Sequence, residues 1–181
     1  TVVAYVWGGV QQVAFYHDEI AYLLQAKIFA SGSIVGAGRP LPEFFEQYHV
    51  FVTPVLAAKY PPGHSLLLVP GLWLGMPGSM PLLLVGASAA LLFVLARRIV
   101  NPWVALAAWL LWTTAPGVLR YHATYLSQST TVFLWLAASY ALLEWRASGE
   151  RRWLVALAAI VGFGSLTRPL TMLAFAIPAA A

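Results

Sequence analysis

Apolar runs separated by short polar breaks fill the chain from residue 64 to its end. Runs of this length and character are typical of helices that cross a membrane. We expect four such helices, at about residues 80–97, 102–119, 127–146 and 152–167. Pro169 interrupts the apolar pattern, and a further helix is expected after it.

Residues 64–76 are just as apolar, but the segment is too short to cross a membrane. The segment has about 13 residues, whereas a span needs roughly 20. We therefore expect a juxtamembrane helix there rather than a fifth span.

Residues 15–64 break the apolar pattern, since this stretch carries most of the ionisable side chains. It holds the chain's only Asp, both Lys, three of the four His and three of the five Glu. We expect an external loop that lies against one face of a membrane and forms the working surface. Within it, residues 18–31 predict an amphipathic surface helix with Asp18 as N-cap and Gly32 as its end. The Gly- and Pro-rich residues 32–63 predict an ordered loop with short helical turns.

The predicted fold class is all-α: a polytopic transmembrane helical bundle with a long external loop that carries juxtamembrane helices. Residues 1–181 are expected to form a single transmembrane domain, with residues 1–14 as the end of a first transmembrane helix and residues 80–181 as the bundle. The chain begins inside an apolar run without Met and ends in another, so we expect the N-terminal portion of a longer protein.

Composition supports a membrane protein. The chain is 61% hydrophobic and 9% charged, whereas a soluble domain usually carries about 25% charged residues. Its net charge of +4 does not indicate nucleic-acid binding, because the Arg residues stand in short clusters between apolar runs. The absence of Cys excludes disulfides, thiolate chemistry and Cys-ligated metals from this chain.

The Arg clusters predict an orientation. Five Arg residues fall in two turns that are separated by two predicted helices, so both turns lie on the same side of the membrane. They are Arg97, Arg98, Arg146, Arg151 and Arg152. The turn between those helices carries only Arg120. Positive residues favour the cytoplasmic side, so this turn and the loop at residues 15–64 belong outside if residues 64–76 do not span.

Asp18 and Glu19 are the candidate catalytic residues. An ionised carboxylate at a helix N-terminus is favoured by the helix dipole and can act as a general base toward a hydroxyl. The alternative for Asp18 is a capping role, which is compatible with catalysis. Glu19 either assists Asp18 or favours the first helical turn.

Two cations are candidates for a lipid phosphate. Lys59 stands in a stiff Lys-Tyr-Pro-Pro setting at the end of the loop, and its alternative is an ordinary interfacial Lys. Tyr60 and His64 flank the same prolines and are assigned with it to substrate binding. Arg168 interrupts an apolar run just before Pro169, where a guanidinium marks a site unless it extends to the interface from a helix end.

A second polar cluster is predicted to line a sugar pocket: Arg120, His122, Tyr125 and Gln128. An interfacial aromatic belt is the alternative, which explains Tyr121 and Tyr125 better than His122. A zinc site made of the four His and Asp18 is disfavoured, because no pair has the spacing of a known ligand motif. We therefore assign no metal ligands and no certain cofactor, and nothing in the sequence indicates a divalent metal.

The order of these motifs resembles the GT-C membrane glycosyltransferases. The resemblance is to bacterial relatives of the protein O-mannosyltransferases and of the aminoarabinose transferase that modifies lipid A. It rests on Asp18-Glu19 opening the loop, Lys59-Tyr-Pro-Pro-Gly closing it, the short helix at residues 64–76, the paired Arg97-Arg98 and the Arg168-Pro step. Many relatives place an acidic residue where this chain has Leu126-Ser127-Gln128.

The resemblance implies a GT-C bundle in a bacterial inner membrane with its active-site loop on the periplasmic side. It implies an inverting transfer from a polyprenyl-phosphate sugar to a hydroxyl on a lipid, glycan or protein, with membrane lipid around the site. Asp18 would deprotonate the acceptor, while Lys59 and Arg168 would stabilise the departing phosphate. The alternatives are a transporter or flippase part that binds an anionic lipid-linked substrate, and a structural subunit without a site.

Overall fold

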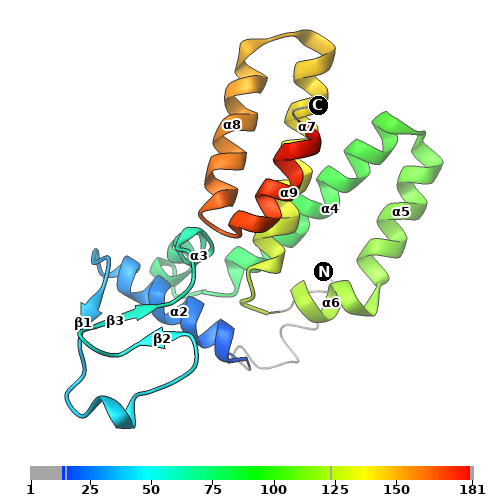
Figure 1. The fold of residues 1–181 in the computed structure, drawn as a ribbon. Coiled ribbons are helices and arrows are strands. Elements are labelled where there is room, and N and C mark those ends of the chain that lie inside the picture. The colour runs from blue at the N-terminus through cyan, green and yellow to red at the C-terminus, as the bar shows by residue number, and fades with distance from the viewer. Residues whose placement is uncertain (1–13, 15, 123, 180–181) are drawn as a thin grey trace.

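The computed structural model describes residue 14, residues 16–122 and residues 124–179. It is 70% helical, which confirms the predicted helical class (Figure 1). The helices are α2 (His17–Ala30), α3 (Gly63–Trp73), α4 (Ser79–Ile99), α5 (Pro102–Thr114), α6 (Pro116–His122), α7 (Gln128–Ser148), α8 (Arg151–Ser165) and α9 (Pro169–Ala179). The helix expected at residues 1–14 lies outside the described residues, apart from residue 14.

Two helical hairpins form the upright part of the molecule. Helix α4 pairs with α5 and α7 pairs with α8, and α4 also packs along α7 (Figure 1). The α4–α5 and α7–α8 turns lie at the same end, where Arg98 of α4 forms an ion pair with Glu144 of α7. The Arg clusters at residues 97–98 and 151–152 therefore lie at the end of the helices opposite α2.

The single helix expected at residues 102–119 is wrong, because the chain breaks at Ala115. That residue is extended, with φ −63° and ψ 125°, and it separates α5 from α6. The cause is Pro116: its ring disfavours the helical conformation of the residue before it. The break turns α6 across the lower end of the helices, toward the N-terminus of α2 (Figure 1).

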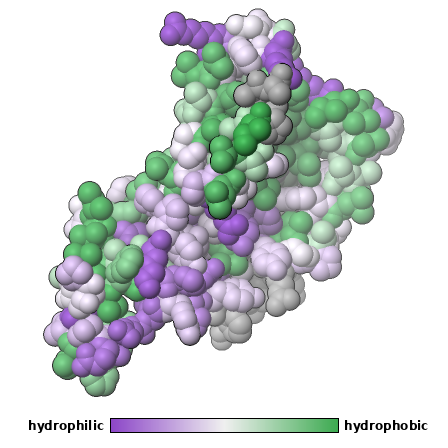
Figure 2. Space-filling model, in the orientation of Figure 1, coloured by the Kyte–Doolittle hydropathy of each residue, from purple (hydrophilic) through white to green (hydrophobic). Residues whose placement is uncertain are grey.

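Of the described helices, α4 alone is long and apolar enough to cross a membrane by length and composition. Large apolar side chains are nevertheless exposed on α5 and α9 as well, including Trp103, Leu111, Leu170 and Ile177. Figure 2 shows hydrophobic residues across the side of α5 and hydrophilic residues gathered over the lower part of the same face.

The loop between α2 and α3 contains a small antiparallel sheet that the sequence analysis missed. Its strands are β1 (Gly36–Ala37), β2 (Val50–Phe51) and β3 (Val55–Ala58), in the order β1-β3-β2. A short 3₁₀ turn at Pro42–Phe44 matches the helical turns expected there. The sheet packs on α2 through a small core: Ala21, Ile28, Val50, Val52 and Leu56.

Helix α3 joins this lower part to the upright helices. The Gly63 N–H donates to the Leu166 carbonyl at 2.7 Å. The fit is close, because a Cβ on Gly63 would lie 2.5 Å from Thr167 Oγ1. The start of α3 is thereby fixed against the end of α8, next to Arg168.

Candidate functional site

Asp18 lies in the first turn of α2, which begins at His17. The expectation that Asp18 is the N-cap is wrong, since Tyr16 occupies that position. The Asp18 carboxylate faces outward. Its Oδ1 lies 3.3 Å from His49 Nε2, and the Asp18 side chain is 44% exposed. A carboxylate in the first turn is still favoured by the helix dipole.

Glu19, the next residue, faces inward and is 2% exposed. Its Oε2 accepts the Tyr16 N–H at 2.9 Å, which closes the first turn of the helix. Its Oε1 accepts the Tyr125 N–H at 2.7 Å, across to the segment before α7. Glu19 thus joins two distant parts of the chain, whereas Asp18 is open to solvent.

Stacked rings connect Asp18 to the interior. The His49 and Tyr60 rings lie 5.0 Å apart, and the Tyr60 and Tyr22 rings lie 4.7 Å apart and nearly parallel. We call these three side chains the aromatic column. Burial raises the pKa of Tyr60, and its hydrogen bond to Asp18 and the Asp18 charge raise it further. Tyr60 is therefore a neutral donor to Asp18 at physiological pH.

Arg168 lies at the inner end of the aromatic column. Its Nε donates to Ser127 Oγ at 2.9 Å, and the Tyr22 hydroxyl donates to the same oxygen at 3.0 Å. Burial raises the pKa of Tyr22, while its bond to Ser127 and the Arg168 charge act in the opposite direction. The charges of Asp18 and Arg168 both influence the pKa values of Tyr22 and Tyr60, so the two predicted residues lie around the same pair of rings.

A cavity of about 510 Å³ opens beside Asp18, which we call the acid cavity. It is lined by Tyr16, His17, Asp18, Tyr48, His49, Tyr121, Leu126 and Gln128. The Gln128 Oε1 atom is buried and has no hydrogen-bond partner among the described residues. A buried acceptor without a partner is costly.

His64 and Tyr125, both predicted to bind substrate, lie inside the protein. His64 is fully buried: its Nδ1 pairs with Thr130 Oγ1 at 2.7 Å and its Nε2 with the Tyr125 carbonyl at 2.8 Å. Burial lowers its pKa to about 4, with the Arg168 charge acting in the same direction. A neutral His64 thus connects α3 to α7. Tyr125 is 1% exposed, and its backbone connects Glu19 to His64.

Two other members of the predicted sugar pocket, Arg120 and His122, lie in α6. His122 packs on Trp112, and its buried Nδ1 has no partner in the part of the chain that the structure describes. Burial lowers its pKa. Tyr121, beside it, is 51% exposed and lines the acid cavity. Arg120 lies in α6, and the structure does not describe its side chain.

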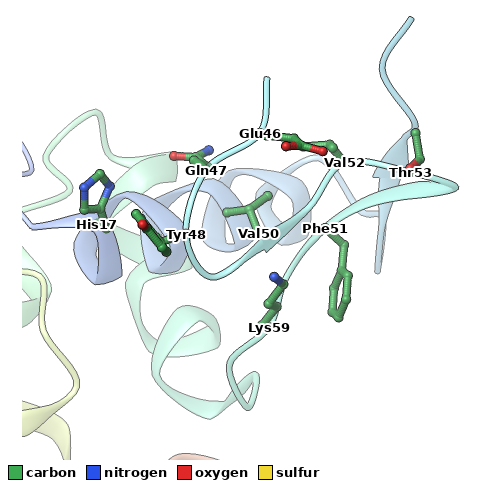
Figure 3. Close-up of a pocket in the computed structure, with 9 residues that line it drawn as sticks. All are labelled: His17, Glu46, Gln47, Tyr48, Val50, Phe51, Val52, Thr53 and Lys59. Carbon is green, nitrogen blue, oxygen red and sulfur yellow. The ribbon is translucent and has the colours of Figure 1, made fainter. Parts of the chain in front are cut away.

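Lys59 lies in a second cavity of about 640 Å³, on the sheet (Figure 3). Its Nζ is 5.1 Å from the centre of the Phe51 ring. His17 and Tyr48 line both cavities and form the boundary between them. The structure therefore joins Asp18 with Arg168 through the aromatic column and places Lys59 in the adjoining cavity.

Sequence reasoning assigned no role in this arrangement to three residues: Tyr22, Ser127, and His49, which was weighed only as a disfavoured zinc ligand. Tyr22 carried a readable signal, because it lies four residues after Asp18 and so on the same helical face. Within the described part of the chain, no group of three or more His, Asp or Glu side chains is placed to hold a metal ion.

Comparison with known proteins gives one match. Residues 79–181, more than half of the chain, match the family model described as dolichyl-phosphate-mannose-protein mannosyltransferase. The matched region runs from α4 to α9 and contains Ser127 and Arg168. No curated protein and no solved structure matches the chain.

Proposed function

The chain belongs to the dolichyl-phosphate-mannose-protein mannosyltransferase family, which points to a glycosyltransferase of the mannosyltransferase type, and on that premise we propose that sugar transfer takes place at the acid cavity. The donor is a polyprenyl-phosphate sugar in the membrane, and the acceptor presents a hydroxyl. The reaction inverts the configuration at the sugar carbon, because one direct displacement replaces the phosphate by the acceptor oxygen.

One observation supports this proposal above the others: a solvent-open carboxylate and a guanidinium flank a single aromatic column. Asp18 is placed to take the proton from the acceptor hydroxyl as general base. Arg168 is placed to stabilise the negative charge that develops on the departing phosphate. Tyr22 and Tyr60 stand between the two charges, and both are neutral donors.

The remaining predicted residues take supporting roles. Gln128 lines the acid cavity and offers its side-chain amide to a hydroxyl of the sugar, and Tyr121 offers an exposed ring to the apolar face of the pyranose. Lys59, in the adjoining cavity, offers a point cation to a substrate phosphate. We place this end of the molecule on the periplasmic side of a bacterial inner membrane, since the Arg clusters lie at the opposite end.

The test is Asp18→Asn in the full-length protein, assayed in membranes with radiolabelled polyprenyl-phosphate mannose. Transfer of label from the donor lipid is expected to fall by at least about 100-fold, because the amide cannot accept the proton. Glu150→Gln is the matched control, since Glu150 lies at the far end of α8 in an exposed ion pair with Arg152. Full transfer by a correctly inserted Asp18→Asn protein would contradict the proposal.

A further inference from the structure

We propose that His49 is a positioning residue that holds the Asp18 carboxylate toward the acid cavity; this rests on the proposed function. The His49 Nε2 and Asp18 Oδ1 atoms are 3.3 Å apart, within the distance of an ion pair. Their side chains are 43% and 44% exposed, and both line the acid cavity. A pair that is open on this side can meet a substrate, unlike the buried Glu19.

The backbone of His49 is held in an unfavourable conformation. Its φ is 65°, in the left-handed region that costs a non-Gly residue about 1–2 kcal/mol. The hairpin imposes this geometry: the Lys59 N–H donates to the His49 carbonyl at 2.8 Å, and the next residue, Val50, pairs with Ala58. Strain that the surrounding structure maintains is concentrated at functional positions, and here it directs a side chain at Asp18.

The ring of His49 is also fixed. It lies against Tyr60 at 5.0 Å, with the planes 32° apart, and against Tyr48 at 6.3 Å. Tyr60 itself hydrogen-bonds Asp18, so the carboxylate has a partner from each of two stacked rings. These two neighbours favour one orientation of the carboxylate over the other rotamers that a half-exposed Asp would sample.

The chemical role follows from that orientation. With His49 and Tyr60 beside it, the Asp18 carboxylate is presented to the acceptor hydroxyl and takes its proton. The hydroxyl oxygen bonds to the sugar carbon as the bond from that carbon to the phosphate oxygen breaks, and the phosphate leaves with the electron pair. The proton ends on Asp18, and His49 is unchanged.

The pairing is tested without any activity by a thermal double-mutant cycle on the full-length protein in detergent micelles. The variants are Asp18→Asn, His49→Asn and the double variant. Asn tolerates the left-handed conformation, so His49→Asn removes the imidazole and keeps the backbone. Each single change is expected to lower the melting temperature by about 1–3 °C, and the double change by no more than either.

His17→Asn combined with Asp18→Asn is the matched control, because His17 lines the same cavity but packs on Tyr48, 5.4 Å away. The shifts of this second pair are expected to add. If the melting-temperature shifts of His49→Asn and Asp18→Asn also add, the pairing is overturned. If they do not add while the wild type transfers no mannose, the pairing stands and the proposed function falls.

The catalytic role is tested with His49→Gly, which keeps the backbone geometry and leaves a space for free imidazole. Transfer from polyprenyl-phosphate mannose is expected to lose about 10–100-fold in kcat with little change in KM, because a misdirected base slows the chemical step. Added imidazole is expected to restore part of kcat in His49→Gly and none in Asp18→Asn. Wild-type kcat in His49→Gly would overturn the role.

Discussion

The two ends of the upright helices hold their charges in opposite ways. At the far end, Glu150 pairs with Arg152, two residues away, and both side chains are about half or more exposed. At the site end, Glu19 is buried and its carboxylate satisfies backbone donors, one of them 106 residues away. The same type of side chain is therefore a surface feature at one end and a structural requirement at the other, and burial makes the difference.

The largest expected difference between the two ends comes from replacing Glu19 and Glu150 by Ala, one at a time. Glu19→Ala leaves the Tyr16 and Tyr125 N–H groups without their acceptor, so the free energy of unfolding is expected to fall by roughly 2–5 kcal/mol. Glu150→Ala is expected to change it by no more than about 0.5 kcal/mol. Tryptophan fluorescence during denaturant unfolding in micelles measures both, and equal losses would show that burial is not the deciding factor.

The pH dependence of stability sharpens the comparison, because His64 is buried at the site end. Its pKa in the folded protein is about 4, below the ordinary value near 6.5, so the unfolded chain binds more protons between these values. Stability is therefore complete above pH 6.5 and falls as the pH drops toward 4, by on the order of 3 kcal/mol.

His64→Gln is expected to flatten this slope, and the buried His122 accounts for part of what remains. Melting temperatures measured from pH 4 to pH 8 test the expectation. An unchanged slope in His64→Gln would assign the effect to other groups.

The smallest expected effect on stability comes from replacing a glycine by Ala at the start of α3 or within α4. Gly63→Ala pushes a methyl group against Thr167 and Leu166, where close packing leaves no room, and is expected to cost about 1–3 kcal/mol. Gly86→Ala, in α4, meets nothing within 4 Å and is expected to be neutral or stabilising by up to about 1 kcal/mol. Thermal unfolding of both proteins measures the difference, which would vanish if the start of α3 could move away from α8.

Much of the helical pattern was readable from the sequence, and the exceptions have local causes. Helix α7 at residues 128–148 lies within two residues of its prediction because a long apolar run and Gly149 define it. The break at Ala115 was overlooked because the apolar run continues through Pro116 without a change in composition. Strands of two residues, such as β2, are too short to show alternation.

The site was partly predictable for a similar reason. Arg168 stood out as a charge in an apolar run and Asp18 as a carboxylate at the start of a predicted helix, and the structure gives them shared neighbours. His49 could not be found, because its place depends on a left-handed backbone and on a hairpin register. Lys59 was grouped with Asp18 by sequence order, but the direction of its side chain at the end of β3 places it in the adjoining cavity.

The hydrogen bonds that build the site also set an order of events during synthesis. Glu19 and Tyr22 leave the ribosome more than a hundred residues before Tyr125 and Ser127, their partners. Arg168 follows Ser127 by a further 41 residues. The contacts of α2 therefore stay incomplete while the later helices α3 to α8 are made. The arrangement around Ser127 is complete only once Arg168 has been made, so a nascent chain arrested before Arg168 has helices α2 to α8 but no assembled site.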